Sequence, residues 1–130
     1  MAVPYYLDVE DVLTAARHAS AVPVDVRDFG LLEAAVVRPQ ATVFGQDAYP
    51  DLFTKAAAML HSLVRNHALV DGNKRTAWAG AWVFLEVNGV RLSERLDVDG
   101  AEKLVLAAAR GEIEVPEVAA GLRGFAEPER

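Results

Sequence analysis

The chain contains no cysteine among its 130 residues. Disulfides, thiolate metal sites and cysteine nucleophiles are therefore excluded. The longest apolar stretch, "AWAGAWVFLEV" at residues 77–87, is interrupted by Glu86 and is shorter than the roughly 20 residues that a membrane span requires. The first residues, "MAVPYYLDVED", have neither a basic segment nor an apolar run, so no signal peptide is expected. These absences predict a soluble, cytoplasmic protein that does not enter a membrane.

The chain also lacks an excess of basic residues, with a formal net charge of −6. Direct nucleic-acid binding is not expected, because neutralisation of phosphates supplies most non-specific affinity for DNA and RNA. This balance still leaves room for one small basic pocket. Hydrophobic residues make up 52% of the chain, which is enough for a core, and the length suits one domain over residues 1–130. The tail from about residue 126 to 130 is expected to be flexible.

Apolar spacing and capping residues predict a chain that is helical almost throughout. Pro39 is expected to end the second helix, and Asn88–Gly89 the fourth. The helix at 76–87 is apolar on nearly every face, which is typical of the middle of a bundle. The predicted fold is a compact all-α bundle of six helices around this central helix. The predicted helices span residues 7–20, 28–38, 50–66, a fourth that starts at 71–73 and ends at 87, 99–110 and 116–125.

The stretch "NHALVDGNKRTAW", residues 66–78, is a polar cluster between two of these helices. The second helix is predicted to start at Asp71–Asn73, where free backbone N–H groups and the helix dipole attract anions. Gly72 permits a tight turn there, and Asn73 can cap the helix or hold the loop through its side-chain amide. Lys74 and Arg75 follow in the first turn, at the end of the helix that is already positive. Two cations there are unfavourable unless an anion binds, so the pattern indicates a phosphate site.

Two further residues suggest that a reaction takes place at this phosphate site. Asp71 offers the oxygen ligands that Mg²⁺ takes together with substrate phosphates. His67 is suited to proton transfer at neutral pH. Together they favour phosphoryl transfer, in which catalysis is mostly positioning and charge stabilisation. A purely structural interpretation stays open, since Asp-Gly and Gly-Asn are common turn residues and Asp71 or Asn73 could simply cap a helix.

The residues of this cluster resemble a known family. "HALVDGNKR" is similar to the Fic signature H-x-F-x-[D/E]-G-N-G-R-x-x-R, and lysine in place of the second glycine is typical of the Doc (death on curing) toxins of the Fic/Doc family. The likeness extends through "YLDVEDVL" and from "RDFGLLEAAVVRPQATVFGQDAYP" to "FLEVNG", so it covers most of the chain. It implies a six-helix Fic/Doc fold with a short flap segment.

The resemblance also implies a role for each matching position. His67 matches the family's general base for a target hydroxyl, and Asp71 matches the acidic residue that binds Mg²⁺ with the nucleotide. The anion-hole segment around the phosphates is matched by Gly72, Asn73 and Arg75. The site residues implied in this way are catalytic His67, Lys74 and Arg75, phosphate-binding Gly72, Asn73, Lys74 and Arg75, and metal-binding Asp71.

Three positions depart from the common Fic pattern. Leu69 replaces phenylalanine, a change that keeps an apolar side chain. Lys74 adds bulk and charge where glycine would leave room. Trp78 stands at the second arginine, which in typical Fic enzymes orients ATP for AMP transfer. The last two changes fit the Doc pattern, in which the nucleotide is reversed and the γ-phosphate moves. The implied reaction is thus phosphorylation, with adenylylation or a non-catalytic binding module of the same fold as alternatives.

The resemblance further implies two protein partners, a substrate and an antitoxin, and two cofactors. The implied substrate is a threonine of elongation factor Tu, whose phosphorylation arrests translation, with ATP and Mg²⁺ as cofactors. The implied antitoxin, Phd-like, folds its C-terminal segment into a groove of the toxin. Thr42 to Tyr49, where strand-forming residues precede a glycine, matches the flap that Fic proteins use to clamp the target, and Phe44 and Gly45 are its candidate residues.

Overall fold

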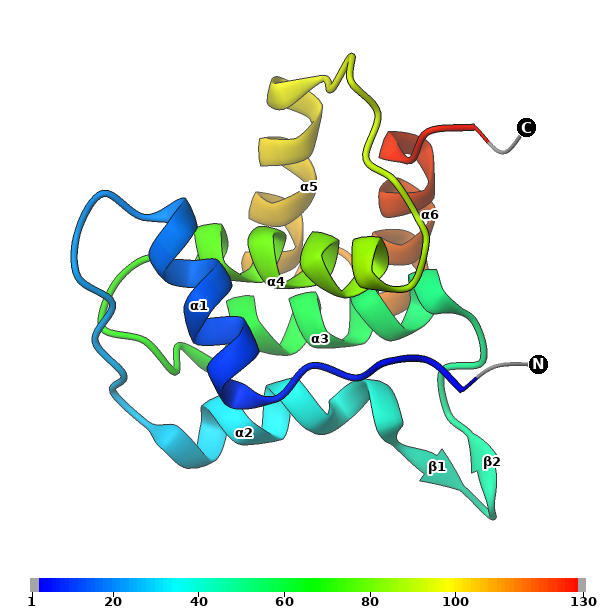
Figure 1. Cartoon of the computed structure of the whole chain (residues 1–130), viewed down its shortest axis with the longest axis horizontal. Helices are drawn as coiled ribbons and strands as arrows, with labels where there is room; N and C mark the ends of the chain where they lie inside the picture. The colour runs from blue at the N-terminus through cyan, green and yellow to red at the C-terminus, as the bar shows by residue number, and fades with distance from the viewer. Residues whose placement is uncertain (1–2, 129–130) are drawn as a thin grey trace.

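A computed structural model describes residues 3–128 and confirms an all-α protein (Figure 1). Within these residues six α-helices are joined by short connections, together with one 3₁₀ turn and one two-stranded hairpin. The helices are α1 (Val9–Ala19), α2 (Phe29–Val37), α3 (Leu52–Asn66), α4 (Asn73–Val87), α5 (Val98–Ala109) and α6 (Val115–Phe125). The remaining elements are the 3₁₀ turn η1 (Arg38–Gln40) and the strands β1 (Thr42–Val43) and β2 (Gln46–Asp47).

Aspartate side chains set the start of four helices. Asp8, Asp28, Asp51 and Asp97 each accept a hydrogen bond from a backbone N–H in the first turn of α1, α2, α3 and α5. The third and fifth helices begin within two residues of the predicted starts, because the carboxylate immediately before each helix satisfies N–H groups that the helix itself cannot pair.

The second helix ends before Pro39, as predicted, and a short 3₁₀ turn follows it. The chain passes from α2 into η1, with Pro39 in the first turn of the new element. Proline is tolerated there because the N–H groups of a first turn have no partner within the helix. The extended backbone begins one step later, at the hairpin.

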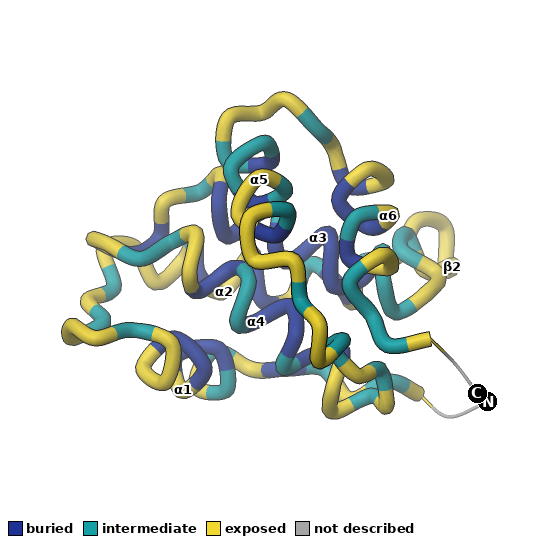
Figure 2. Tube along the Cα trace, turned by 90° about the horizontal axis from the view of Figure 1, so that it is seen from above, coloured by how far each residue is buried: buried dark blue, intermediate teal, exposed yellow. Residues whose placement is uncertain are grey.

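The centre of the molecule is the antiparallel pair α3 and α4 (Figure 1). Most of the buried trace seen in Figure 2 belongs to this pair and to the helix faces turned toward it. The apolar helix α4 packs on α1, α3 and α5, whereas α3 contacts α2, η1, α4, α5 and α6. The predicted central helix α4 thus shares that place with α3, the more enclosed of the two. Its small residues Ala56, Ala57 and Ala58, all fully buried, let the neighbours approach closely.

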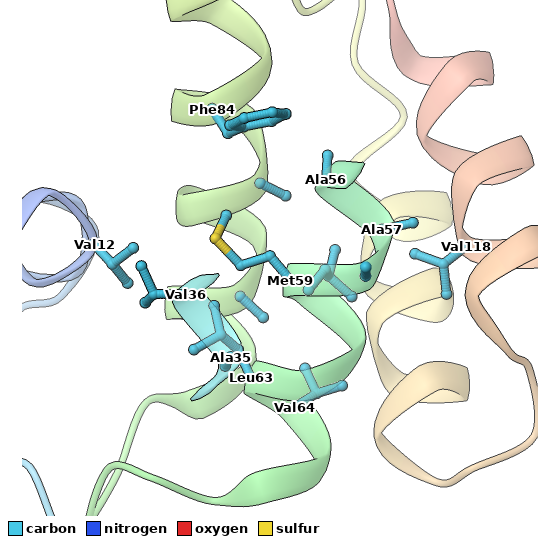
Figure 3. Packing of buried hydrophobic residues seen from close by; sticks show 14 of the residues in the cluster. Val12, Ala35, Val36, Ala56, Ala57, Met59, Leu63, Val64, Phe84 and Val118 are labelled. Carbon is cyan, nitrogen blue, oxygen red and sulfur yellow. The ribbon is translucent and has the colours of Figure 1, made fainter. Parts of the chain in front are cut away.

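One cluster of buried side chains draws on all six helices. Figure 3 shows Met59 and Leu63 of α3 between Val36 of α2 and the side chains of α4, with Val118 of α6 on the far side of α3. Close packing of this kind gives the two helices that flank the polar cluster a rigid frame. In residues 3–128, the structure has no helix long and apolar enough to cross a membrane.

The predicted hairpin is present, as a tight two-residue turn. Thr42 pairs with Asp47 and Val43 with Gln46, and the turn residues Phe44 and Gly45 have φ of 52° and 79°. Positive φ at both central residues is the turn geometry that best matches the twist of short antiparallel strands.

The beginning of the predicted flexible tail is held in place. Ala126 forms an antiparallel bridge with Leu92, and the N–H of Glu127 donates to the carbonyl of Arg91 at 2.7 Å. Residues 129 and 130, to which the prediction also applied, lie outside the described residues.

Candidate active site

The polar cluster lines a cavity of about 600 Å³, here called the site cavity. Its walls are the end of α3, the loop of residues 67–72, the first turn of α4 and one face of α5. The volume lies within the range of roughly 300–1,000 Å³ that is usual for small-molecule sites. The structure brings six predicted site residues to this one cavity: His67, Asp71, Gly72, Asn73, Lys74 and Arg75.

The loop owes its shape to two residues of the motif. The side-chain amide of Asn73 donates to the carbonyl of Leu69 and accepts from the N–H of Leu69, both at 3.0 Å. Gly72 has φ of 80°, which glycine adopts without strain, and its carbonyl accepts the first backbone bond of α4. Asn73 thus fixes the loop behind it rather than capping the helix, and the helix starts within the predicted range.

The first turn of α4 is open to a ligand. Its N-cap is Gly72, which has no side chain to accept from the free N–H groups, and no acidic residue lies in the turn. In the described helices, aspartate caps α1, α2, α3 and α5, and α6 begins with a proline in its first turn. Uncapped N–H groups and the positive end of the helix dipole form an anion site.

Comparisons with known proteins agree with this geometry. The sequence model of the Fic/DOC family matches residues 6–85, well over half of the chain. The chain belongs to the Fic/DOC family.

Two curated relatives are similar over most of their length. One is "Toxin Doc" of Mycolicibacterium smegmatis (strain ATCC 700084 / mc(2)155), 61% identical over 93% of this chain and 93% of its own. The other is "Protein kinase doc" of Escherichia phage P1, 41% identical over 74% of this chain and 73% of its own. The Fic/DOC match runs from before α1 almost to the end of α4, so it includes the whole loop of the site cavity.

The charged groups of this Fic/DOC site differ in whether they already form hydrogen bonds within the chain. One carboxylate oxygen of Asp71, Oδ1, accepts from the N–H of Gly72 at 2.8 Å, which leaves Oδ2 available. Arg75 donates to the hydroxyl of Ser20 at 3.2 Å, so its guanidinium is held toward the end of α1. Lys74 is exposed, and within residues 3–128 no ion pair or hydrogen bond of its side chain is recorded.

The donor set fits a nucleotide with a divalent cation. Phosphates suit the open helix start and the two cations, and the apolar side of the cavity, formed by Trp78, Ala101 and Val105, suits a planar base. Residues 3–128 contain no cluster of three His, Asp or Glu residues that could hold a metal by themselves. A Mg²⁺ ion at Asp71 would therefore take its remaining ligands from phosphates and water, as this ion commonly does.

The structure does not bring Phe44 and Gly45 to the site cavity. The hairpin precedes α3 and is attached to its first turn, where Lys55 binds Asp47 at 3.1 Å, whereas His67 follows the last turn. A 15-residue helix is about 22 Å long, and Figure 1 shows the two features at its opposite ends. The flap role of Phe44 and Gly45 stays a prediction, and the structure adds only that the hairpin lies at the other end of α3 from the site cavity.

The connection between α1 and α2, residues 20–28, lies beside the site instead. Val26 forms an antiparallel bridge with Leu69, and the N–H of Val70 donates to the carbonyl of Asp25 at 2.9 Å. Sequence reasoning missed this segment, since it has no periodicity and lies some forty residues before the motif. The α5 wall, including Glu102, was missed as well, because its side chains look like an ordinary amphipathic face.

A second cavity of about 720 Å³ lies between α1 and α4, here called the α1–α4 groove. Its apolar lining includes Leu7 and Trp82, and its rim carries the acidic residues Asp11 and Glu86. The negative charge of Asp11 raises the pKa of the neighbouring Tyr5 hydroxyl, which shows the electrostatic character of this rim. Trp78 lines both the groove and the site cavity.

Proposed function

We propose that this chain is the toxin of a toxin–antitoxin module and that it transfers the γ-phosphate of ATP to a threonine hydroxyl of elongation factor Tu. The observation that carries the proposal is that His67, Asp71 and the uncapped start of α4 line one cavity. The two relatives described above are named as a toxin and as a protein kinase, and both names support this class of activity. The choice of threonine and of elongation factor Tu rests on the family resemblance.

In the proposed reaction His67 removes the proton from the target hydroxyl while the hydroxyl oxygen attacks the γ-phosphorus. The bond between the γ-phosphorus and the bridging oxygen breaks, so that ADP leaves and phosphothreonine forms. The N–H groups of the first turn of α4, with Lys74 and Arg75, stabilise the charge on the transferring group. Asp71 would hold Mg²⁺, which supplies charge neutralisation at the phosphates.

Arg75 must change partners for this role. Its guanidinium is bound to Ser20, a neutral hydroxyl whose own proton is donated to the carbonyl of Val22 at 2.9 Å. A bond from a cation to phosphate is charge-assisted and stronger than one to a neutral hydroxyl. The proposal therefore includes an exchange of Ser20 for a phosphate oxygen when the nucleotide binds.

Labelled ATP distinguishes the possible activities. The purified chain is incubated with elongation factor Tu and ATP carrying the label at either the α- or the γ-phosphate. Transfer of the γ-label alone is expected, and loss of at least a hundredfold in rate is expected for His67→Ala, since general acid–base groups contribute about 10²–10⁴-fold. Transfer of the α-label would show adenylylation instead.

A matched control separates chemistry from folding. His18 is an exposed histidine on α1, outside the site cavity, and His18→Ala should leave the transfer rate unchanged. If neither label moves although ATP binds and the fold is intact, the chain is a non-catalytic binding module and the proposed enzyme activity is wrong.

We further propose that the α1–α4 groove receives the C-terminal segment of the antitoxin as a helix. The groove is apolar at its base and acidic at Asp11 and Glu86, which suits an amphipathic segment with basic residues along one side. Charge reversal by Glu86→Lys should weaken binding of a synthetic antitoxin segment, measured by calorimetry. The same reversal at Glu33, an exposed residue of α2 outside the groove, should not.

A further inference from the structure

The backbone of His67 is in an unusual conformation. His67 is the C-cap of α3, with φ of 50° and ψ of 46°, in the left-handed region. In residues 3–128, only Phe44 shares a positive φ without being glycine. Such a conformation is unfavourable for a residue with a side chain and persists only where neighbouring contacts enforce it. His67 therefore needs contacts that hold it.

The side chain of Arg27 makes these contacts. Its Nε donates to the carbonyl of His67 at 2.8 Å, and Nη2 donates to the same oxygen and, at 3.4 Å, to the carbonyl of Asn66. These carbonyls lie at the C-terminal end of α3, where backbone acceptors lack helical partners and a cation is favoured. The backbone N–H of Arg27 adds a bond to the carbonyl of Ala68 at 2.7 Å.

The loop is thus held from two sides. Asn73 binds both backbone groups of Leu69 from the start of α4, and Arg27 binds His67 and Ala68 from the α1–α2 connection. None of the side-chain hydrogen bonds of residues 3–128 uses the imidazole of His67, whereas its carbonyl is bound by Arg27. The ring stays available to a substrate while the backbone that carries it is fixed.

We propose that Arg27 is a positioning residue, which holds His67 in the left-handed conformation that directs its imidazole into the site cavity. It does not touch the reacting atoms and acts through the histidine. This inference rests on the proposed function, in which His67 removes the proton. Its effect should appear in the rate of the chemical step, because displacement of a catalytic group by about 1 Å can cost about a hundredfold.

The first experiment compares Arg27→Ala, Arg27→Lys and Arg27→Gln in phosphorylation of elongation factor Tu. Arg27→Ala should lower kcat by about ten- to a hundredfold with an unchanged KM for ATP, and Arg27→Lys should recover part of it. Millimolar guanidinium should also restore part of the kcat of Arg27→Ala. The control is Arg17→Ala, which removes an exposed arginine of α1 whose nearest partner is Glu10.

An unchanged kcat in Arg27→Ala would overturn the inference. A loss of kcat that parallels a loss of Tm would also overturn it, if neither guanidinium nor the Arg27→Lys substitution restores kcat. That pattern is expected of a residue with a purely structural role.

The second experiment does not depend on activity. Ring resonances of the three histidines are assigned by NMR through single substitutions, and the spectrum of Arg27→Ala is compared with that of the unchanged chain. Only the His67 signals should shift or broaden, while those of His18 and His61 stay in place. If the unchanged chain transfers no phosphate but His67 still responds, the proposed function fails and the positioning by Arg27 stands. If His67 does not respond, the positioning is wrong whatever the activity.

Discussion

The polar groups near the start of α3 have partners within the chain, whereas several of those beyond its end have none in the described structure. At its start, Asp51 forms a capping box with Thr54, and Lys55, the only charged side chain buried within residues 3–128, binds Asp47 and the carbonyl of Pro39. At its end, across the loop, the first turn of α4 has no cap, and the side chain of Lys74 has no recorded bond in the described structure.

The two ends differ in whether their polar groups have hydrogen-bond partners within the chain, and not in how polar they are. A polar cluster whose donors and acceptors are matched within the chain is a structural device. A cluster that leaves free N–H groups, a carboxylate oxygen and the ammonium of Lys74 around a cavity gains partners for these groups when a ligand binds. The next four experiments test this contrast between the two ends.

The largest expected effect comes from removing the same side chain at each end. Asp71→Ala takes the carboxylate from the site cavity and should lower phosphotransfer by about a hundredfold or more, since a catalytic metal contributes several kcal/mol. Its stability should change little. Asp51→Ala removes a helix cap and should lower the free energy of unfolding by about 1 kcal/mol with kcat unchanged. Equal losses of activity in both variants would contradict the contrast.

A smaller effect is expected at Lys74. Lys74→Gln removes a cation from the positive end of α4, so the free protein should unfold at a slightly higher temperature. Affinity for ATP should fall about tenfold, which corresponds to one charge-assisted bond. Thermal unfolding with and without ATP and Mg²⁺ measures both. A variant that is less stable without nucleotide would show that Lys74 has a structural partner after all.

Lys55→Met should affect neither end strongly. The side chain is 2% exposed, and its partner Asp47 is 53% exposed, so the carboxylate can be solvated when the lysine is gone. Replacement of a buried charge by an apolar side chain of similar length is often neutral or stabilising, by about 1 kcal/mol here. Chemical denaturation and kcat are the measurements. A large loss of kcat would mean that the hairpin acts on the site cavity across the length of α3.

The smallest effect is a pH dependence at His61, in the middle of α3. Burial, and then the neighbouring Arg38 guanidinium, lower the pKa of His61 below its ordinary value of 6.5, with Glu114 opposing. The unfolded chain therefore binds a proton more readily, and stability should fall as the pH drops below about 6.5. His61→Gln should make this decline between pH 7 and 5 shallower. An unchanged slope would place the pH dependence in other groups.

The sequence predicted the local features of the site well, because they depend on nearby residues. The start of α4 follows from the turn at Gly72 and the apolar run behind it, and the helix start that the anion hypothesis requires is present without a side-chain cap. Asn73 was expected to cap a helix or hold the loop, and its two bonds to Leu69 decide for the loop.

What could not be predicted depends on contacts between distant segments. Arg27 looked like the end of an irregular connection, and only the fold brings it to His67, forty residues later. The burial of Lys55 could not be predicted because a lysine is normally solvated, and Tyr6, whose ring centre lies 5.7 Å from its ammonium, is far away in sequence. The hairpin itself was predicted from its residues, but the end of α3 at which it lies was not.

Trp78 forms part of both cavities, so it is a shared wall between the proposed nucleotide site and the proposed antitoxin site. Its ring also contacts Trp82 and Phe125, with centroids 5.8 Å and 5.7 Å away, so it cannot shift toward one cavity without disturbing the packing beside the other. We expect the two proposed ligands to be thermodynamically linked through this side chain. Whatever factor the antitoxin imposes on nucleotide affinity, the nucleotide must impose on antitoxin affinity in return. The cell's ATP would in this way help to set how tightly the toxin is restrained.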